Sequence, residues 1–338
     1  MSHWKVTIQK VHNFTPIENA DRIEVAHVLG WKCVVKKGDF EIGDMGVYIP
    51  LDSEVPHDED RYPFMKGSKY RVRTVKLRGQ ISQGLFLPMD FFTSQERSDI
   101  DKVASGEDIS QTIGVTQYEP QMSAKMNVAS EGYIPSIIKR TDQERLQNIP
   151  EIINLFQTNT FEMSEKLNGS SVQMYLYEGG LKVCSRNMLL KNVKGSAHWA
   201  IAEKYGVEEK LRSFSRNISL QGELVGPKIQ GNPYKLNEID WYIFDIWDVD
   251  EQKYILPAER QAIISYLGLK HVPIWDDALV PYDDMSVDDF LKLSDGMSVM
   301  NPEAVREGLV YKSMDYIDGE IVSFKVVNNE LLLEVTNG

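Results

Sequence analysis

The sequence predicts an α+β protein in which a small β-barrel is followed by a second domain of antiparallel sheets flanked by helices. Three observations predict this fold class. Short runs of β-branched residues separated by polar or glycine turns fill residues 1–115, and this pattern weakens from about residue 94. Strand and helix patterns then alternate over residues 131–338. We therefore expect two domains, 1–115 and 131–338, joined by a linker over 116–130, which suits a chain of 338 residues.

The first domain contains several short strand-like runs at close spacing, which is typical of a small barrel. The runs cover residues 6–11, 22–29, 32–35, 45–50 and 84–88. The segment from His12 to Ile23, followed by Gly30-Trp31, resembles the start of an OB-fold of the tRNA-binding-domain type. Asn19-Ala20-Asp21 is equally good turn and capping chemistry, and both explanations stay open.

A basic stretch from Lys69 to Gly79 predicts one more strand in this domain. Strand alternation would place its basic side chains on two faces, with three on one face and two on the other. A basic strand with an interleaved aromatic residue suits a groove that follows a phosphate backbone. The alternative is a solvated strand beside the acidic loop Asp58-Glu59-Asp60. The predicted nucleic-acid-binding residues are Lys69, Arg71 and Arg73 on the first face, and Lys76 and Arg78 on the second.

The second domain combines helices with strands rich in β-branched and aromatic residues. The predicted helices cover residues 142–157, interrupted at Pro150, then 196–214, 257–267 and 287–294. The predicted strands cover residues 161–166, 172–177, 181–185, 218–225, 240–247, 307–312, 320–327 and 330–335. Glu178-Gly179-Gly180 predicts a hairpin turn between the second and third of these strands.

Composition narrows the class of protein. The net charge of −13 opposes a protein that merely coats nucleic acid, because phosphate affinity comes from Lys and Arg. No apolar run approaches the roughly 20 residues of a membrane helix, and the first residues lack the apolar stretch of a signal peptide. Cys33 and Cys184 are too few for a disulfide framework or a zinc site. We expect a cytoplasmic monomer with two buried, reduced thiols and no membrane partner.

The stretch from Ser164 to Ser171 is the strongest functional signal. A strand-like run ends at Lys166 and breaks at Asn168-Gly169, which places the lysine at the rim of a sheet. A lysine amine is a nucleophile only when it is neutral, and desolvation and nearby cations favour that state. Alone, this tetrapeptide is most often an ordinary corner between a strand and a turn.

Further sequence motifs follow this stretch in order. Together they favour a functional role for it over an ordinary corner. The series resembles nucleotidyltransferase motifs I, Ia, III, IIIa, IV and V of the covalent-lysine superfamily, which comprises DNA ligases, RNA ligases and mRNA capping enzymes. After motif I, the blocks are Ser185-Arg186-Asn187, Gly222-Glu223-Leu224-Val225-Gly226, Tyr242-Ile243-Phe244-Asp245-Ile246, Glu307-Gly308-Leu309-Val310-Tyr311-Lys312 and Ser323-Phe324-Lys325.

This resemblance implies a role for each matching residue. Lys166 would be the nucleophile and would carry AMP from ATP as a lysyl phosphoramidate. Glu307 matches the metal-site glutamate, and Glu223 would help to organise Mg²⁺ or Mn²⁺ through water or would hold a ribose hydroxyl. The other implied nucleotide-binding residues are Glu165, Asn168 and Gly169 of motif I, Arg186 near the ribose or nick, Phe244 stacked on the purine, and Lys312 and Lys325 flanking the triphosphate.

Two residues depart from the motifs. Motif I more often reads Lys-x-Asp-Gly, and here Asn168 supplies an amide without the full charge. Motif V is often Lys-x-Lys, and here Val326-Val327 follow Lys325. The roles of the third motif I residue and of the second phosphate-binding lysine are therefore in doubt.

The order of the domains selects one branch of the superfamily. The barrel-like domain comes first, and little sequence follows motif V, where DNA ligases and capping enzymes carry an OB domain with motif VI. This order resembles the family 5 RNA ligases. It implies an ATP-dependent RNA ligase that seals a 5′-phosphate to a 3′-hydroxyl in RNA or in a nicked duplex with RNA on the 3′-hydroxyl side. The alternatives are a GTP-dependent, capping-type guanylyltransferase and a non-catalytic RNA-binding protein with a degenerate transferase fold.

Overall fold

The computed structural model describes residues 4–58, 60–118, 129–279 and 285–337. The chain divides into two compact units. The first unit contains Met1–Gln121, Leu146–Pro150 and Glu330–Gly338, and the second contains Met122–Arg145 and Glu151–Asn329. The predicted linker, 116–130, falls mostly outside the described residues, so the domain boundaries stay a prediction.

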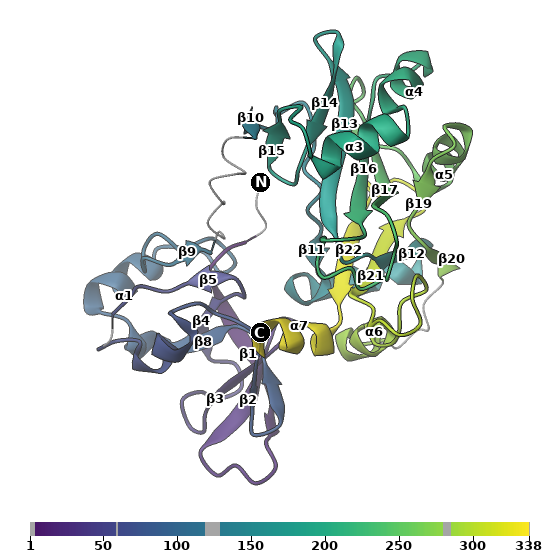
Figure 1. Cartoon of the computed structure of the whole chain (residues 1–338). Coiled ribbons are helices and arrows are strands. Elements are labelled where there is room, and N and C mark those ends of the chain that lie inside the picture. The colour runs from purple at the N-terminus through teal and green to yellow at the C-terminus, as the bar shows by residue number, and fades with distance from the viewer. Residues whose placement is uncertain (1–3, 59, 119–128, 280–284, 338) are drawn as a thin grey trace. The chain divides into compact units, whose positions relative to one another are not determined.

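The first unit is a nearly closed antiparallel barrel at the purple end of the colour scale in Figure 1, and it confirms the predicted β-barrel. One strand belongs to both halves of the barrel, because β1 pairs with β4 through its first residues and with β2 from Val11 onward, with a bulge between Val11 and Asn13. Such a bulge bends a strand and helps a sheet to curl. The sheet order is β3-β2-β1-β4-β8, formed by β1 (Thr7–Pro16), β2 (Ile23–Val28), β3 (Trp31–Lys36), β4 (Met45–Ile49) and β8 (Leu85–Pro88).

Alternation along these strands fills the barrel with apolar side chains. Val11, Val28, Val47 and Ile49 are fully buried in one cluster, and the free thiol of Cys33 is buried with them. The unit also contains a two-stranded ribbon of β5 (Ser53–Glu54) and β9 (Thr116–Gln117), a hairpin of β6 (Val75–Leu77) and β7 (Gln80–Ser82), and the 3₁₀ helices η1 (Pro63–Ser68), η2 (Met89–Phe91) and η3 (Leu146–Asn148).

A short helix, α1 (Ser94–Ile100), lies where the sequence pattern fades. Thr93 caps it by accepting from the backbone N–H of Glu96, and the Glu96 side chain accepts in return from the Thr93 backbone. Only Ile100 is buried among its residues, which explains the weak periodicity. The Thr-x-x-Glu capping pattern was the available signal.

The continuous basic strand predicted from Lys69 to Gly79 is wrong. Lys69 and Tyr70 have φ values of 54° and 61°, so the chain turns sharply where alternation was expected to begin. Arg78 and Gly79, with φ values of 50° and 83°, form the two-residue turn of the β6–β7 hairpin. Regular strand geometry is left only at Val75–Leu77 and Gln80–Ser82, so the two predicted faces do not exist.

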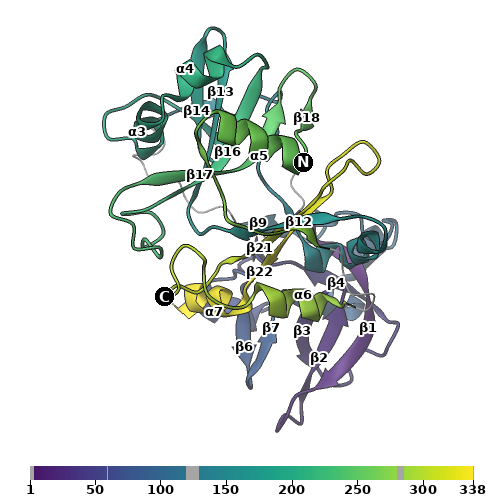
Figure 2. The same ribbon diagram turned by 90° about the vertical axis from the view of Figure 1, so that its right-hand side faces the viewer.

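The second unit contains two sheets, and helices pack against each of them (Figure 2). The larger sheet has the order β10-β15-β14-β13-β16-β17-β18, with β19 beside β17. Its strands are β10 (Ser130–Tyr133), β13 (Ser170–Tyr177), β14 (Gly180–Cys184), β15 (Met188–Leu190), β16 (Ile218–Val225), β17 (Asp240–Asp248), β18 (Lys253–Tyr254) and β19 (Lys270–His271).

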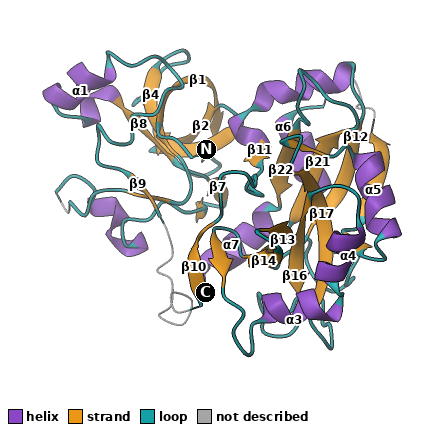
Figure 3. Ribbon diagram, turned by 90° about the horizontal axis from the view of Figure 1, so that it is seen from above, coloured by secondary structure: helices purple, strands orange, loops and turns teal. Residues whose placement is uncertain are grey.

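Helices α3 (Ala197–Lys204), α4 (Val207–Ser213) and α5 (Pro257–Tyr266) cover the outer face of this sheet (Figure 3). Their apolar residues, among them Ile201, Leu211 and Ile263, pack with Val172, Leu220 and Ile243 of the strands. The predicted single helix 196–214 is therefore two helices. Gly206, with φ 57°, separates them because it adopts a left-handed conformation.

The smaller sheet has the order β11-β22-β21-β12-β20. Its strands are β11 (Glu144–Arg145), β12 (Phe161–Lys166), β20 (Ile274–Leu279), β21 (Gly308–Ser313) and β22 (Ser323–Val327). Phe156 of η4 (Pro150–Gln157) and Phe290 of α6 (Val287–Ser294) pack on the aromatic side chains of its outer face.

Two predicted elements of the second domain differ from the structure. The helix predicted over 142–157 is confirmed only in part, by the 3₁₀ helices η3 and η4. Residues 142–157 form no α-helix, because Glu144–Arg145 pair with Phe324–Lys325 as a parallel strand and η4 begins at Pro150. The last predicted strand, 330–335, is helix α7 (Asn329–Asn337). Strand β22 already has β21 and β11 on its two edges, so no edge is left for another strand there, and the Glu- and Leu-rich sequence is a good helix former.

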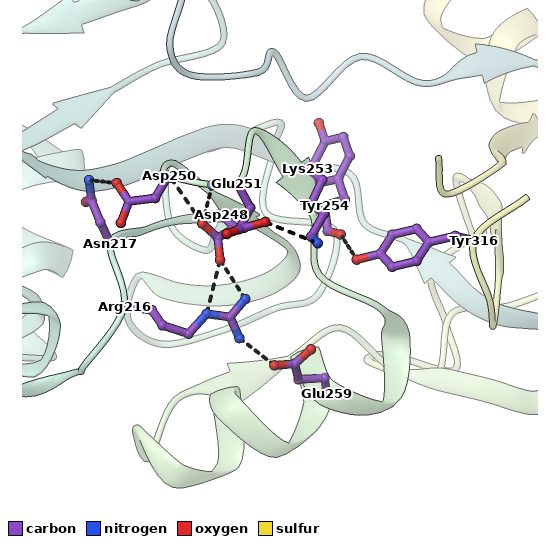
Figure 4. Close-up of polar contacts among 9 residues, drawn as sticks. All are labelled: Arg216, Asn217, Asp248, Asp250, Glu251, Lys253, Tyr254, Glu259 and Tyr316. Atoms are coloured by element: carbon purple, nitrogen blue, oxygen red, sulfur yellow. Dashed lines mark hydrogen bonds and ion pairs between the residues drawn. The ribbon is translucent and has the colours of Figure 1, made fainter. Parts of the chain in front are cut away.

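A polar cluster lies where β16 begins and β17 ends in the larger sheet (Figure 4). The Arg216 guanidinium donates to Asp248 from Nε and Nη2, at 3.0 and 2.6 Å, and to Glu259 of α5 from Nη1 at 2.5 Å. Asp248 also accepts the backbone N–H groups of Asp250 and Glu251 at the turn into β18. The cluster therefore ties α5 to the end of β17.

Among the residues that the structure describes, no helix is long and apolar enough to cross a membrane. The predicted hairpin of β13 and β14 is confirmed, with Glu178 and Gly179 at its turn. Cys184 of β14 is a buried free thiol, as expected.

Candidate active site

Lys166 is the last residue of β12, as predicted, and strand alternation decides which side chains share its face. Glu162, Ser164 and Lys166 lie on one face of the smaller sheet, opposite Lys312, Val310 and Gly308 of β21. Phe161 on the other face packs with Phe324, which stacks on Tyr311. One face of the sheet thus contains an aromatic core, and the other carries Glu162, Lys166 and Lys312.

Glu307 meets Lys166 directly. Its Oε1 lies 2.6 Å from the Lys166 Nζ, and 27% of the Lys166 side chain and 19% of the Glu307 side chain are exposed. The contact follows from strand register, because Lys166 pairs with Gly308, the next residue after Glu307. A Cβ on Gly308 would lie 2.1 Å from the Val326 carbonyl oxygen, so this strand approach requires glycine.

The motif I turn packs tightly against β16. A Cβ on Gly169 would lie 2.3 Å from the Leu224 carbonyl oxygen, so only glycine fits there. The Asn168 backbone N–H donates to the Tyr234 hydroxyl at 2.6 Å, which fixes the turn from the other side. Gly169 and Asn168 therefore allow the motif I turn to lie close to β16. This places Glu223, the residue before Leu224, near Lys166.

Glu223 lies within the electrostatic reach of both Lys166 and Glu307. Burial raises the pKa of its carboxyl to about 8, the Glu307 charge acts in the same direction, and the Lys166 charge opposes the shift. A carboxyl of this kind is protonated near neutral pH until a cation enters. Perturbed acids beside a nucleophile are typical of catalytic sites.

Lys325 lies on the same face of the sheet, opposite Val310. Burial lowers the pKa of its ammonium to about 8, and the cations Arg145 and Lys166 lower it further. A partly desolvated cation next to Lys166 is suited to meet a phosphate.

Lys312 is placed differently. Only 2% of its side chain is exposed, and its Nζ donates to Asp245 at 2.7 Å and to the Phe244 carbonyl at 2.5 Å. Burial lowers the pKa of this ammonium, while Asp245 favours its charged form. The geometry favours a structural tie between the two sheets over the phosphate contact expected from the sequence.

Phe244 is the extra residue of a β-bulge in β17. Gln221 pairs with Asp245 and the next residue, Gly222, pairs with Ile243, so Phe244 has no partner in the ladder. Its ring is half-buried beside Leu167 and Tyr234. A bulge of this kind redirects a side chain, and it is often found next to active sites.

Two other expected nucleotide contacts lie away from the Lys166 side chain or at the surface. The Glu165 side chain is on the opposite face of β12, where it accepts from the Ser298 hydroxyl at 2.5 Å and from the Val299 N–H at 2.8 Å. Arg186 follows β14 and is exposed, and it forms an ion pair of 2.5 Å with Asp142. Its charge still reaches Glu223 and Lys325.

The carboxylates of Glu307 and Glu223 are the candidate ligands for a divalent cation at this site. No group of three or more His, Cys, Asp or Glu side chains that could hold a metal occurs among the described residues. Mg²⁺ and similar ions keep several waters and bind through one or two carboxylates together with phosphates. The two glutamates beside Lys166 fit that mode of binding.

The five basic residues predicted for nucleic-acid binding lie in the first unit in different settings. Arg71 is engaged within the barrel, because it pairs with Asp52 at 2.6 Å and its guanidinium lies 3.8 Å from the centre of the Tyr118 ring. Arg73 is half-buried, and Lys69 is exposed at the kink. Lys76 and Arg78 are exposed on the β6–β7 hairpin, beside the exposed apolar residues Val75 and Leu77.

Sequence reasoning did not single out three residues close to this site: Glu162, Tyr234 and Arg260. The Arg260 guanidinium is fully buried and donates to Glu162 across the gap between the sheets. Glu162 is one of three charged residues in the strand run 161–166, and its position inside that run was the one available signal for it. Tyr234 lies in an irregular loop and carried none.

Comparisons with known proteins agree with this architecture. A family model described as RNA ligase matches residues 159–327, and an OB-fold domain model matches residues 5–89. The search of curated proteins found no match.

Solved structures of a Naegleria gruberi RNA ligase match the whole chain. One, with PPi, is 38% identical with a TM-score of 0.89 and covers 100% of both chains. Two mutants of that ligase are each 39% identical with a TM-score of 0.87, and each match covers 97% of this chain. The match covers 98% of the mutant with ATP and Mn and 97% of the mutant with AMP and Mn.

An OB-type barrel ahead of a domain that carries a motif lysine between two sheets is the architecture of a covalent nucleotidyltransferase. The chain belongs to the RNA ligase family. The predicted fold class and enzyme class are both confirmed.

Proposed function

We propose that this protein is an ATP-dependent RNA ligase that works through a lysyl-AMP intermediate on Lys166. The observation that carries the proposal is the convergence of four residues: Lys166, Glu223 and Lys325 on three strands of two sheets, and Glu307 directly before β21. Family membership and the ATP, AMP and Mn named for the Naegleria gruberi structures support the choice of nucleotide and cation.

In the first step, the Lys166 Nζ attacks the α-phosphorus of ATP. The N–P bond forms, the bond between the α- and β-phosphates breaks, pyrophosphate leaves, and the amine loses a proton. Glu307 holds the amine in an ion pair before nucleotide binding. If Glu307 and Glu223 contributed to holding a divalent cation, the Glu307 charge would no longer favour the protonated amine. The cation supplies charge neutralisation at the phosphates.

Two further steps complete the reaction. The 5′-phosphate of the RNA attacks the AMP phosphorus, so the N–P bond breaks and a 5′–5′ pyrophosphate bond forms. The 3′-hydroxyl then attacks the 5′-phosphate, and AMP leaves as the phosphodiester bond closes. Lys325, beside Lys166, would neutralise phosphate charge, and Phe244 would stack on the adenine.

We propose a nicked duplex with RNA on the 3′-hydroxyl side as the preferred substrate. The exposed residues Lys76 and Arg78 of the first unit would contribute phosphate contacts to it. Arg71 is occupied by Asp52 and Tyr118, so it is a weaker candidate for such a contact.

A labelling experiment tests the proposal. Wild type and Lys166→Arg are incubated with radiolabelled ATP and Mg²⁺, because arginine keeps the charge opposite Glu307 but cannot replace the nucleophilic amine. We expect label on wild type alone, and sealing of RNA-containing nicks faster than all-DNA nicks. Labelling by GTP in preference to ATP would support the guanylyltransferase alternative. RNA binding without label would support the non-catalytic alternative.

A further inference from the structure

A buried cluster of charged side chains joins the two sheets of the second unit. Glu162 and Lys312 come from the smaller sheet, Asp245 comes from the larger one, and Arg260 comes from α5. The side chains of Glu162 and Arg260 are 0% exposed, and those of Lys312 and Asp245 are 2% and 8% exposed. Charged groups this deeply buried are rare unless each has partners.

Arg260 lies at the centre of the cluster. Its Nη2 donates to Glu162 and its Nη1 lies 3.6 Å from the Asp245 Oδ1, so one guanidinium contacts carboxylates of both sheets. Gln261 donates to the second oxygen of Glu162 at 2.8 Å. Burial disfavours the Glu162 charge, but Arg260 and Lys312 together hold the pKa of this carboxyl below its usual range.

His271 fixes the plane of the guanidinium. The Arg260 Nε lies 3.1 Å from the His271 Nε2, and the His271 Nδ1 lies 2.6 Å from the Val272 carbonyl oxygen. Both contacts are hydrogen bonds only if Nδ1 carries the proton and Nε2 accepts. Burial and the Arg260 charge lower the pKa of His271 to about 4, which agrees with a neutral ring.

The cluster ends at the bulge that presents Phe244. Lys312 donates to Asp245 and to the carbonyl of Phe244, and its Nζ lies 5.7 Å from the centre of the Phe244 ring. The bulge residue lacks a partner in the β-ladder, so this lysine satisfies its carbonyl. The position of Phe244 therefore depends on Lys312, and that of Lys312 on Asp245.

We propose that Arg260 is a positioning residue for the nucleotide: through Glu162 and Asp245 it fixes Lys312 on the bulge and thereby sets the distance of the Phe244 ring from Lys166. This inference rests on the proposed function, in which Phe244 binds the base. The cost of burying charges makes stabilisation a poor explanation of the cluster, because well-packed apolar replacements are often as stable. Fixing the geometry between two sheets is a better one.

The test separates positioning from stability. Arg260→Met alone leaves Glu162 buried without its main partner, and this variant should lose stability. The double variant Glu162→Gln/Arg260→Met removes both charges and should recover most of that loss. Arg216→Met is the matched control, because Arg216 also joins β17 to α5 but through the far end of the strand, at Asp248 and Glu259.

Adenylylation of Lys166 is measured for each folded variant as kcat and as KM for ATP, and sealing of a pre-adenylylated nick is measured separately. For the double variant we expect KM to rise about tenfold and kcat to stay within about twofold, because ground-state positioning of the base is lost. Sealing of the pre-adenylylated nick and all parameters of the control should match wild type.

A double variant that is folded and has the KM of wild type would overturn the proposal and leave a purely structural cluster. A matching fall in kcat and in the sealing rate would overturn it too, because the damage would extend beyond nucleotide binding. A wild-type protein that takes no label from ATP would overturn the proposed function and this inference with it.

Discussion

The Lys166 ammonium and the Glu307 carboxylate form an ion pair, with the Nζ 2.6 Å from Oε1. The two residues meet because β12 and β21 are paired so that Lys166 stands opposite Gly308. Before nucleotide binding, the Glu307 carboxylate balances the positive charge of the Lys166 ammonium. In the proposed function, this nitrogen later becomes the nucleophile, and the same carboxylate would then serve as a cation ligand.

Replacement of Glu307 by Gln should separate these uses. The amide can still accept from Lys166 but carries no charge for a divalent cation. We expect adenylylation to fall by about 10²–10³, the range found when one electrostatic contact of a catalytic site is removed. Stability should change by less than about 1 kcal/mol, because the pair is partly exposed. Glu259→Gln is the matched control, and equal labelling of both variants would contradict the assignment.

The raised pKa of Glu223 makes stability depend on pH. The unfolded carboxyl titrates near 4.3, and the folded one titrates at about 8, so the folded state holds this proton more tightly. The stabilisation of the folded state by this bound proton is therefore complete below about pH 4, and it is lost as the pH rises towards 8. Without nucleotide or cation, wild type should lose roughly 5 kcal/mol over this range relative to Glu223→Gln, because each unit between the two pKa values corresponds to about 1.4 kcal/mol. If the two proteins differ in their free energy of unfolding in urea by the same amount at every pH in that range, this prediction is refuted.

Tyr234→Phe tests the support of the motif I turn. The Asn168 N–H would lose its acceptor while staying partly buried. We expect a loss of about 1–3 kcal/mol in the free energy of unfolding and slower adenylylation, because the turn adjoins Lys166. Tyr205→Phe, which removes a hydroxyl bonded to Asp240 at the start of β17, should cost stability without slowing adenylylation of the folded protein. The idea fails if both variants label at the wild-type rate.

The β6–β7 hairpin should serve the nucleic acid and not the nucleotide. Lys76→Glu/Arg78→Glu reverses two exposed charges, and sealing of nicked RNA-containing duplex should weaken and lose about one to two units of its log–log salt slope. Adenylylation should be unchanged. Lys10→Glu/Lys36→Glu, with two exposed lysines of the same unit, is the control for net charge. An equal loss of sealing in both variants would point to net charge alone.

The sequence was sufficient to predict those site residues that depend on a local pattern. Lys166 at a strand end and the glycines beside it, 169 and 308, follow from short motifs whose spacing the fold preserves. The buried cluster around Arg260 could not be predicted, because an arginine on an amphipathic helix normally faces solvent, and only the packing of β12 against α5 reveals its partner. The basic strand failed because two left-handed residues, Lys69 and Tyr70, break an apparently regular alternation.

The prediction of a last strand over 330–335 was wrong for a related reason. The run from Glu330 to Val335 is apolar enough for either a strand or a helix, and only the occupied edges of β22 decide between them. Short apolar runs are ambiguous for this reason.

Peptide mass spectrometry of the protein after incubation with ATP and Mg²⁺, without RNA, tests the central claim most directly. The account predicts that the peptide containing Lys166 gains the mass of one AMP, that fragmentation places it on Lys166, and that added pyrophosphate removes it. Unmodified Lys166 under these conditions, or AMP on Lys325 or Lys312 instead, would contradict the account.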